Sequence, residues 1–478
     1  MIRHTLVYIY VFGFGLYAFK DWYKSLCALI LMMAAVRHPD MPRTLMGIQG
    51  LTPWNILLVF VILGCFCQKK EENLKWDMLG KINILLLLYL IVVLMGFYRM
   101  INDTAGIYEY ASFLGKQTPT SKYFISEYLI NSVKWVIPGL LLFYGCNSKE
   151  RLVLGLIATA GIYVFLAIQV IRWIPMESIR GGAELARKAA KTLDVEVGMH
   201  RVELSIMFGG AFWGVYLLHT LSKRKIVRFI SYFSSFSILL ALSLTGGRSG
   251  YLGWIGTGAV VSYARNKKYL FILPITGLLL VIILPAVSQR MFYGVSKKGQ
   301  VNIETRDSLE DTYIYHGINL YKVTSGRILV WSKVIKKIAE KPFFGYGRMA
   351  MQRTGVASSI WLEYREIFGH PHNAYLQCIF DNGLIGFLPI ILFHLLVIKY
   401  SWYLLKHAKM PEHIIAGGMA LAIVTGFLIG VNGGLSFYPR EEAVGRWCSI
   451  GLMLRVFINQ MKHPEDKDLA IRENANKI

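Results

Sequence analysis

The sequence predicts an all-α, polytopic integral membrane protein of about twelve to thirteen transmembrane helices. A large, partly helical segment outside the membrane is expected between two late spans. Hydrophobic residues make up 55% of the 478 residues, charged residues only 17%, and the mean hydropathy is +0.45. Soluble domains contain roughly 25% charged residues. The apolar runs are long and recurrent, and about 20 apolar residues suffice to cross a bilayer.

The apolar runs predict the spans in chain order. They lie near residues 5–19, 24–36, 53–67, 82–98, 126–145, 152–171, 204–221, 228–245, 250–264, 269–287, 375–399, 414–434 and 446–461. The first two are short and cross the membrane once or twice, so the side of the N-terminus stays open. None of the six cysteines forms a CxxC pair, which disfavours a zinc site or a disulfide framework.

The net charge of +23 is explained by basic loops of a membrane protein, so nucleic-acid binding is not expected. Lys and Arg gather in the short loops 68–81, 222–228 and 265–268 and in the tail. The positive-inside rule therefore assigns these loops to the cytoplasm. The long segment 288–374 falls on the other side although it is basic. Loops beyond about 60 residues are exempt from that rule, and a basic outer segment calls for an anionic partner such as phosphate.

Five regions follow from this arrangement. They are 1–200 with spans but no diagnostic motif, 201–287 with spans and the turn TGGRSGYL, 288–374 outside the membrane, 375–461 with the last spans, and 462–478 as a cytoplasmic tail. Within 288–374, apolar spacing predicts a helix over 327–341 that ends at Pro342.

Three polar clusters on the predicted outer side could carry chemistry. TGGRSGYL puts Arg248 at the apex of a sharp turn between two spans, where an ionisable residue often marks a functional site. The alternative is an arginine that snorkels to the interface. SGRILVW puts Arg327 at a helix start, where free N–H groups attract anions and Ser325 could cap the helix. The alternative is a solvated surface arginine.

The third cluster is GHPHNAYLQCIFDNGLIG, which holds His370 and His372 just before a span. Histidine is the usual general base near neutral pH. The intervening Pro371 hinders both rings from turning onto one ion, and no matched carboxylate or cysteine set accompanies them, so a metal is not expected. Asp381 lies deeper in the span and is expected to make a buried structural hydrogen bond.

At this point the sequence resembles the superfamily of O-antigen ligases and polymerases. The third cluster is similar to that family's pattern of His-Asn, nine residues and Gly-x-x-Gly, here His372, Asn373, Gly383 and Gly386. The likeness covers roughly residues 205–460.

The other two clusters resemble family landmarks in the expected order. Arg248 is followed four positions on by Leu252, and SGR-x-x-x-W is followed by PFFGYG. One departure is that the family's first motif often reads Ser-Arg-Gly, whereas this chain has Gly-Arg-Ser-Gly at 247–250. The arginine is retained.

The resemblance implies an inverting, metal-independent glycosyltransferase without a cofactor. It would move a glycan from an undecaprenyl diphosphate carrier to lipid A-core, or to another glycan or protein acceptor, on the periplasmic face of the bacterial inner membrane. Arg248 and Arg327 would hold the diphosphate, because fixed positive charge must replace a divalent ion there. His372 would be the general base.

Asn373, Ser325 and His370 are further candidates for substrate binding, and membrane lipids are expected partners. A polysaccharide polymerase needs the same arginines and histidine, so the motifs do not separate it from a ligase. A transporter of lipid-linked sugars is disfavoured, because no internal repeat is visible and the polar clusters lie at the surface rather than at the midplane.

Overall fold

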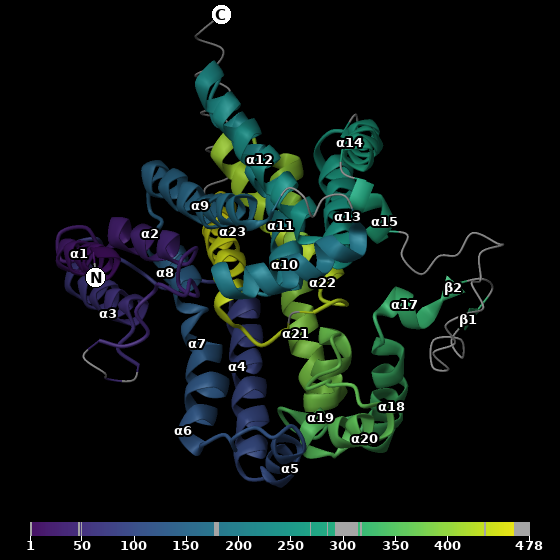
Figure 1. Ribbon diagram of the computed structural model, residues 1–478. Coiled ribbons are helices and arrows are strands. Elements are labelled where there is room, and N and C mark those ends of the chain that lie inside the picture. Colours follow the sequence, from purple (N-terminus) through teal and green to yellow (C-terminus); the bar gives the residue numbers. More distant parts are fainter. Residues whose placement is uncertain are drawn as a thin grey trace, which may run out of the picture.

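The computed structural model describes residues 2–45, 48, 50–175, 181–267, 269–283, 285–291, 314–315, 318–434 and 436–462. This part of the chain is almost entirely helical (Figure 1). Its one named sheet is a two-stranded antiparallel pair of β1 (Ile314–Tyr315) and β2 (Ile318–Asn319). The all-α expectation is confirmed.

The N-terminal third forms a group of helices that packs on the rest through an apolar core. These helices are α1 (Ile2–Tyr17), α2 (Trp22–Met32), α3 (Pro53–Gln68), α4 (Gly80–Ile101), α5 (Ala105–Phe113), α6 (Ser121–Phe124), η1 (Ile125–Ile130), α7 (Asn131–Lys134), α8 (Ile137–Gly145), α9 (Lys149–Trp173) and α10 (Gly182–Glu196). Side-chain caps define several helix starts. The Thr52 hydroxyl oxygen accepts from the backbone N–H of Asn55, the third residue of α3, and Pro53 is the first residue of that helix.

The C-terminal part supplies the centre of the bundle and the segment that leaves it. Its elements are α11 (Arg201–Tyr216), η3 (Leu217–Thr220), α12 (Lys225–Thr245), α13 (Arg248–Arg265), α14 (Tyr269–Ile283), α15 (Pro285–Met291), α17 (Leu320–Thr324), α18 (Arg327–Glu340), α19 (Ala350–Arg353), α20 (Val356–Tyr364), α21 (Ala374–His407), α22 (Pro411–Gly430), η4 (Glu441–Ala443) and α23 (Val444–Lys462). Close helix approach is possible because Gly210 of α11 faces Gly426 of α22, where a Cβ on Gly426 would lie 2.6 Å from the Gly210 Cα.

Six described helical stretches are long and apolar enough to cross a membrane. They are Gly80–Ile101, Lys149–Trp173, Arg201–Thr220, Lys225–Thr245, Ala374–His407 and Pro411–Gly430, and three shorter apolar helices lie at His4–Tyr17, Trp22–Met32 and Pro53–Gln68. A multi-pass membrane protein is thereby supported, while the count of twelve to thirteen spans stays a prediction.

Two predicted spans are interrupted. The stretch expected at 126–145 divides into the π-helical η1, α7 and α8, with a break at Trp135 and Val136. Within α21, Gly383 has a φ of 66° and a non-helical ψ, so the helix bends there. The backbone N–H groups of Leu384 and Ile385 donate instead to the carbonyls of Pro342 and Phe343, at 2.8 and 3.1 Å. Kinks of this kind need another partner for the released backbone groups.

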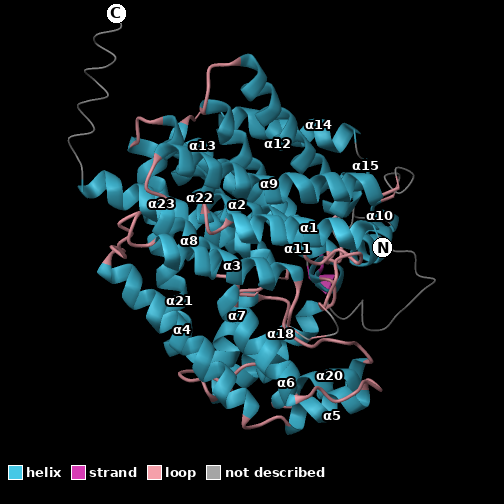
Figure 2. Cartoon of the chain, turned by 90° about the vertical axis from the view of Figure 1, so that its left-hand side faces the viewer, coloured by secondary structure: helices cyan, strands magenta, loops and turns pink. Residues whose placement is uncertain are grey.

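The segment between α15 and α21 has a small core of its own. In both views α18 and α20 gather with α5 at one end of the molecule, and Figure 1 shows α19 there as well (Figures 1 and 2). Buried apolar residues from these helices and from the start of α21 pack together there: Tyr110, Val330, Val334, Ala350, Met351, Val356, Ala357, Ile360, Phe368 and Phe380. The predicted helix at 327–341 is confirmed as α18, which ends before Pro342. Residues 292–313 of the expected outer segment lie outside the described residues.

Candidate active site

All three predicted clusters lie at the starts of helices. Arg248 is the first residue of α13, Arg327 the first residue of α18, and Asn373 caps α21. The first turn of a helix has backbone N–H groups without intrahelical partners, and the helix dipole adds positive potential there. Arginine at the same positions strengthens the preference for an anion.

The turn TGGRSGYL is held tightly from three sides. Gly246 ends α12 with a φ of 62°, a conformation that favours glycine. Its carbonyl accepts hydrogen bonds from Arg201 Nη1 at 3.1 Å and from Arg290 Nε at 3.4 Å. At Gly247 a Cβ would lie 2.2 Å from Ser205 Oγ, so a side chain has no room. The turn therefore presents Arg248 in a defined position.

Arg248 joins the first cluster to the second. Its Nη2 donates to Ser325 Oγ at 2.8 Å and to the Lys322 carbonyl at 3.1 Å. Ser325 does not cap α18, contrary to the expectation, because the capping residue is Gly326 and makes no side-chain bond. Ser325 instead ends α17 with a φ of 55°, which turns its backbone out of the helical path.

Arg327 is half-buried and follows Ser325, the hydrogen-bond partner of Arg248, by two residues. Burial, together with the positive charge of Arg248, lowers the pKa of Arg327 to about 10. The two positive charges repel one another, and a bound anion would relieve that repulsion. The two arginines predicted from separate motifs are thus brought together.

The two histidines pack against each other at the start of α21. Their ring centroids are 4.0 Å apart, and the His372 backbone N–H donates to His370 Nδ1 at 3.2 Å. His372 has a φ of 51°, which is uncommon for a residue with a side chain and often occurs at functional sites. Trp331 of SGRILVW donates from Nε1 to the Pro371 carbonyl at 2.9 Å, which connects the second cluster to the third.

Both imidazoles are held in the neutral form. Desolvation and the positive charges of Arg440 and Arg327 lower the pKa of His370 to about 4. The pKa of His372 falls to about 2 through desolvation, His370 and Arg327. His370 is exposed at the surface of the molecule, whereas His372 is half-buried. A neutral imidazole can accept a proton, and a bound anion would raise its pKa by opposing the arginine charges.

Asn373 has a structural role in this geometry. Its Oδ1 accepts from the backbone N–H groups of Tyr375 and Leu376 at 3.0 and 3.2 Å, and its Nδ2 donates to Asn432 Oδ1 at 3.3 Å. Asn432 belongs to the turn after α22, in which Gly433 packs against Ser249. The side chain therefore ties the histidine cluster to the arginine turn.

The similarity to known proteins falls in the same part of the chain. The O-antigen ligase family model matches residues 233–391, a segment that contains Arg248, Arg327 and His372. An O-antigen ligase of Pseudomonas aeruginosa is 26% identical over 149 residues, which cover 31% of this chain and 34% of that protein. Residues 233–391, about a third of the chain, are therefore similar to the O-antigen ligase family.

Two further relatives carry the name “putative polysaccharide ligase”. The protein from Rickettsia bellii is 31% identical and the one from Rickettsia felis 30% identical, each over 168 residues that cover 34% of this chain and 37% of the relative. The chain therefore spans only about a third of the length of the curated relatives it matches.

The sequence motifs did not include several charged residues near this candidate site. Arg201 is electrostatically coupled to Arg290, Arg248 and Arg327, and His200 to both histidines. Arg440 is the remaining neighbour of His370. Arg201, His200 and Arg440 lie outside the matched segment and in no recognisable motif. Their only sequence signal was a place on the predicted outer side.

The remaining expectations concern Asp381 and metal binding. Asp381 is buried, and its carboxylate accepts from the Ala350 N–H and the Tyr438 hydroxyl, each at 3.1 Å. The predicted structural hydrogen bond is confirmed. In the described ranges, no group of three or more His, Cys, Asp or Glu side chains is placed to hold a metal ion.

Proposed function

We propose that the protein is a glycosyltransferase of the O-antigen ligase type that moves a glycan from undecaprenyl diphosphate to lipid A-core or to another acceptor. The observation that carries this proposal is the convergence of Arg248, Arg327 and His372, from three separate segments, at the starts of three helices. The site would face the periplasm, in a multi-pass protein of the bacterial inner membrane.

In this mechanism Arg248 and Arg327 bind the diphosphate together with the N–H groups at the starts of α13 and α18. The acceptor hydroxyl oxygen attacks the anomeric carbon as the bond from that carbon to the diphosphate oxygen breaks. The leaving diphosphate takes the electron pair, and the arginines stabilise its added charge. Attack opposite the leaving group inverts the anomeric configuration.

His372 accepts the hydroxyl proton as the new glycosidic bond forms. Its ring is neutral before the reaction, as a general base must be. The diphosphate next to Arg327 raises the His372 pKa toward the range in which proton acceptance is effective. His370 supports the ring of His372 by direct packing and through the bond to its backbone N–H.

The test compares null cells that express wild type, His372→Ala or His370→Ala. We expect His372→Ala to lower transfer by about 10²–10⁴-fold, the usual contribution of a general base. His370→Ala, which removes a supporting contact, should have a smaller effect. The readout is the size distribution of carrier-linked and surface glycan, with protein levels matched by immunoblot.

Each outcome has a distinct meaning. Long glycan stranded on the carrier in His372→Ala cells means that transfer to the acceptor is lost, as a ligase requires. Single repeats on the carrier mean that chain growth is lost, which identifies a polymerase. Unchanged surface glycan would refute His372 as the base.

A further inference from the structure

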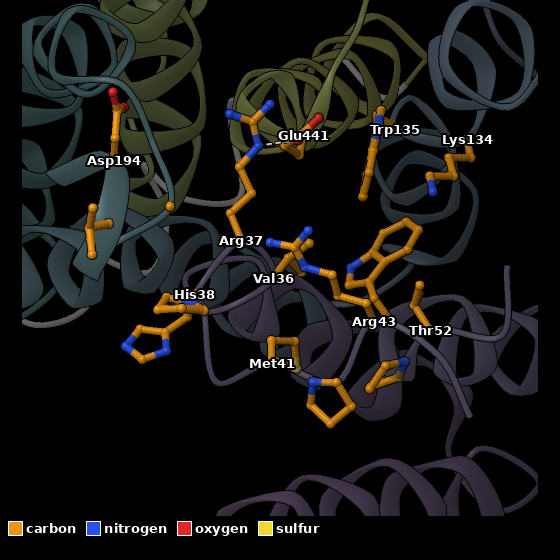
Figure 3. A pocket seen from close by; sticks show the side chains of 16 residues that line it. Val36, Arg37, His38, Met41, Arg43, Thr52, Lys134, Trp135, Asp194 and Glu441 are labelled. Carbon is orange, nitrogen blue, oxygen red and sulfur yellow. Dashed lines mark hydrogen bonds and ion pairs between the residues drawn. The ribbon is translucent and has the colours of Figure 1, made fainter. Parts of the chain in front are cut away.

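Two features at the surface of the described chain are candidates for a further partner. The first is a polar cavity of about 540 Å³ beside the loop after α2 (Figure 3). Arg37, which lines it, is already paired with Glu203 at 3.1 Å and with Glu441, toward which its side chain points in Figure 3. The second is the turn PFFGYG at 342–347, whose two phenylalanines lie open at the surface.

Phe343 and Phe344 are exposed although their side chains are large and apolar. Their exposed fractions are 60% and 67%. Apolar side chains that gather at a protein surface mark contacts with another protein or with a membrane. The surroundings of the turn decide between these two partners.

The backbone of the turn is fixed to two helices that are long and apolar enough to cross a membrane, α4 and α21. The carbonyls of the first two residues of the turn accept from the N–H groups of Leu384 and Ile385 in α21, at 2.8 and 3.1 Å. The next two carbonyls accept from Arg99 Nη1 and Nη2, near the end of α4, at 2.6 and 2.7 Å. The phenylalanine rings are therefore carried by a backbone that both helices hold in place.

The two rings continue the apolar surface of these helices. Leu384 and Ile385 of α21 are exposed, and so are Met95 and Tyr98 near the end of α4. In a bilayer, exposed apolar side chains on spanning helices face lipid. With 22 residues α4 is about 33 Å long, close to the ~30 Å of the hydrocarbon core. The end of α4, and the turn bound to it, therefore lie at one surface of the membrane.

Two cationic side chains accompany the phenylalanines. Lys341 directly precedes the turn and is exposed, and its ammonium lies 4.9 Å from the centre of the Tyr346 ring. Arg99 adds a second positive charge, which its two carbonyl partners do not neutralise. Aromatic side chains are enriched at the membrane–water interface, where Lys and Arg reach the lipid headgroups. The combination favours a lipid surface over a protein partner.

We propose that the PFFGYG turn is a membrane anchor, in which Phe343 and Phe344 insert among the lipid chains at the membrane surface and Lys341 contacts the phosphates of the headgroups. The turn follows the end of α18, and Arg327 is the first residue of that helix. The anchor therefore restrains the position of Arg327 relative to the lipid surface. This assignment does not depend on the proposed transferase function.

The test measures the depth of a nitroxide label by electron paramagnetic resonance, on the full-length protein in lipid nanodiscs. Cys67→Ser removes the exposed cysteine, and the other five are buried. Phe344→Cys is labelled on this background. Leu87→Cys, exposed within α4, is the lipid reference, and Gln117→Cys, exposed in the loop after α5, is the water reference. Oxygen concentrates in lipid and a nickel chelate in water. The label at position 344 should collide with oxygen more often than with the chelate, as the label at position 87 does.

Leu362→Cys is the matched control, because Leu362 is an exposed apolar residue of the same segment, on α20. Its label should behave like the water reference. A label at position 344 that also behaves like the water reference would overturn the anchor. A label at position 362 that lies in lipid would overturn it too, since the turn would then have no distinct role. Phe343→Cys repeats the measurement if Phe344→Cys does not fold.

A second comparison tests the contact of Lys341 with the headgroups. The label at position 344 should lie deeper in bilayers of phosphatidylglycerol than in bilayers of phosphatidylcholine, because an anionic surface attracts the lysine. Lys341→Gln should remove this difference. Lys336→Gln, an exposed change earlier in α18, should retain it. Equal depths in the two lipids would overturn the contact between Lys341 and the headgroups.

Discussion

At the scale of single residues, the proposed chemistry depends on two adjacent imidazoles, those of His370 and His372, whose pKa values are lowered. Their low pKa values come from desolvation and from neighbouring positive charge, not from any feature of the HPHN sequence itself. The same environment has a cost for folding, because an unfolded histidine with its usual pKa near 6.5 binds a proton that the folded site excludes.

Stability should consequently fall as the pH drops below about 6.5. The unfolded chain then binds more protons at His372 than the folded chain, so the free energy of unfolding decreases, by up to about 1.4 kcal/mol per pH unit for this group. Thermal unfolding of detergent-purified wild type and His372→Ala between pH 7.5 and 5 checks this. The variant should lose less stability over that interval, and parallel curves would contradict the expectation.

A separate prediction concerns the arginines of the candidate site. Arg327→Ala should lower transfer about 10²–10³-fold, because fixed charge at the leaving group is lost. Arg327→Lys should fall between this and wild type, since an ammonium keeps the charge but loses the planar fork. Lys333→Ala is the control: it removes one positive charge from the same helix, where Lys333 pairs with Glu363. Equal losses in Arg327→Ala and Lys333→Ala would show only a general effect of charge.

At the scale of secondary structure, the bend in α21 connects the histidine cluster to the segment outside the bundle. Gly383 adopts a positive φ, and a Cβ there would lie 2.2 Å from the Phe343 carbonyl carbon. The PFFGYG turn can approach α21 only because no side chain intervenes. Gly345 of this turn also has a positive φ.

Gly383→Ala should destabilise the protein by about 1–3 kcal/mol or more, from backbone strain and the clash with Phe343. Gly13→Ala is a matched control, since it lies within α1 with nothing inside 4 Å of the added Cβ. It should be neutral or slightly stabilising. Thermal unfolding monitored by circular dichroism measures both, and similar melting temperatures for the two variants would contradict the role of the bend.

At the scale of the whole molecule, one buried arginine, Arg348, connects the segment between α15 and α21 to the helix bundle. Arg348 donates from Nη1 to the Tyr128 carbonyl at 2.6 Å and to Ser132 Oγ at 2.7 Å. Its guanidinium also lies over the ring of Tyr438, 4.0 Å from the ring centre. The backbone N–H of Arg348 donates to the Gly96 carbonyl of α4 at 3.0 Å. Three other chain segments therefore meet at Arg348, two at its side chain and one at its backbone N–H.

Arg348→Ala should loosen this attachment, since each hydrogen bond to a charged group contributes about 1.5–3 kcal/mol. Limited trypsin digestion should cut the segment between α15 and α21 faster than in wild type. Lys336→Ala, an exposed change on α18, serves as the control and should leave cleavage there unchanged except at its own site. An unchanged digestion rate for Arg348→Ala would argue against the anchoring role.

Composition and apolar periodicity were sufficient for the helical fold class, because long apolar stretches leave few alternatives to membrane helices. They were also sufficient to predict α18, because its apolar spacing and its end before Pro342 depend only on nearby residues. The interruption of the span at 126–145 and the bend at Gly383 were not predictable in the same way. The bend depends on the contacts of α21 with Pro342 and Phe343, whereas the break at Trp135 and Val136 directly precedes Pro138 at the start of α8 and so also has a local cause.

The sequence by itself determined which residue types are available for chemistry: two arginine motifs, one histidine pair and their order along the chain. Only the tertiary structure decided that Arg248 meets Ser325, that Asn373 is occupied as a helix cap, and that Arg201, His200 and Arg440 surround the site. The physical reason is the separation along the chain over which each interaction acts. Capping and amphipathicity act within a few residues, whereas charges as far apart in the chain as His200 and His372 become neighbours only when the helices that carry them pack.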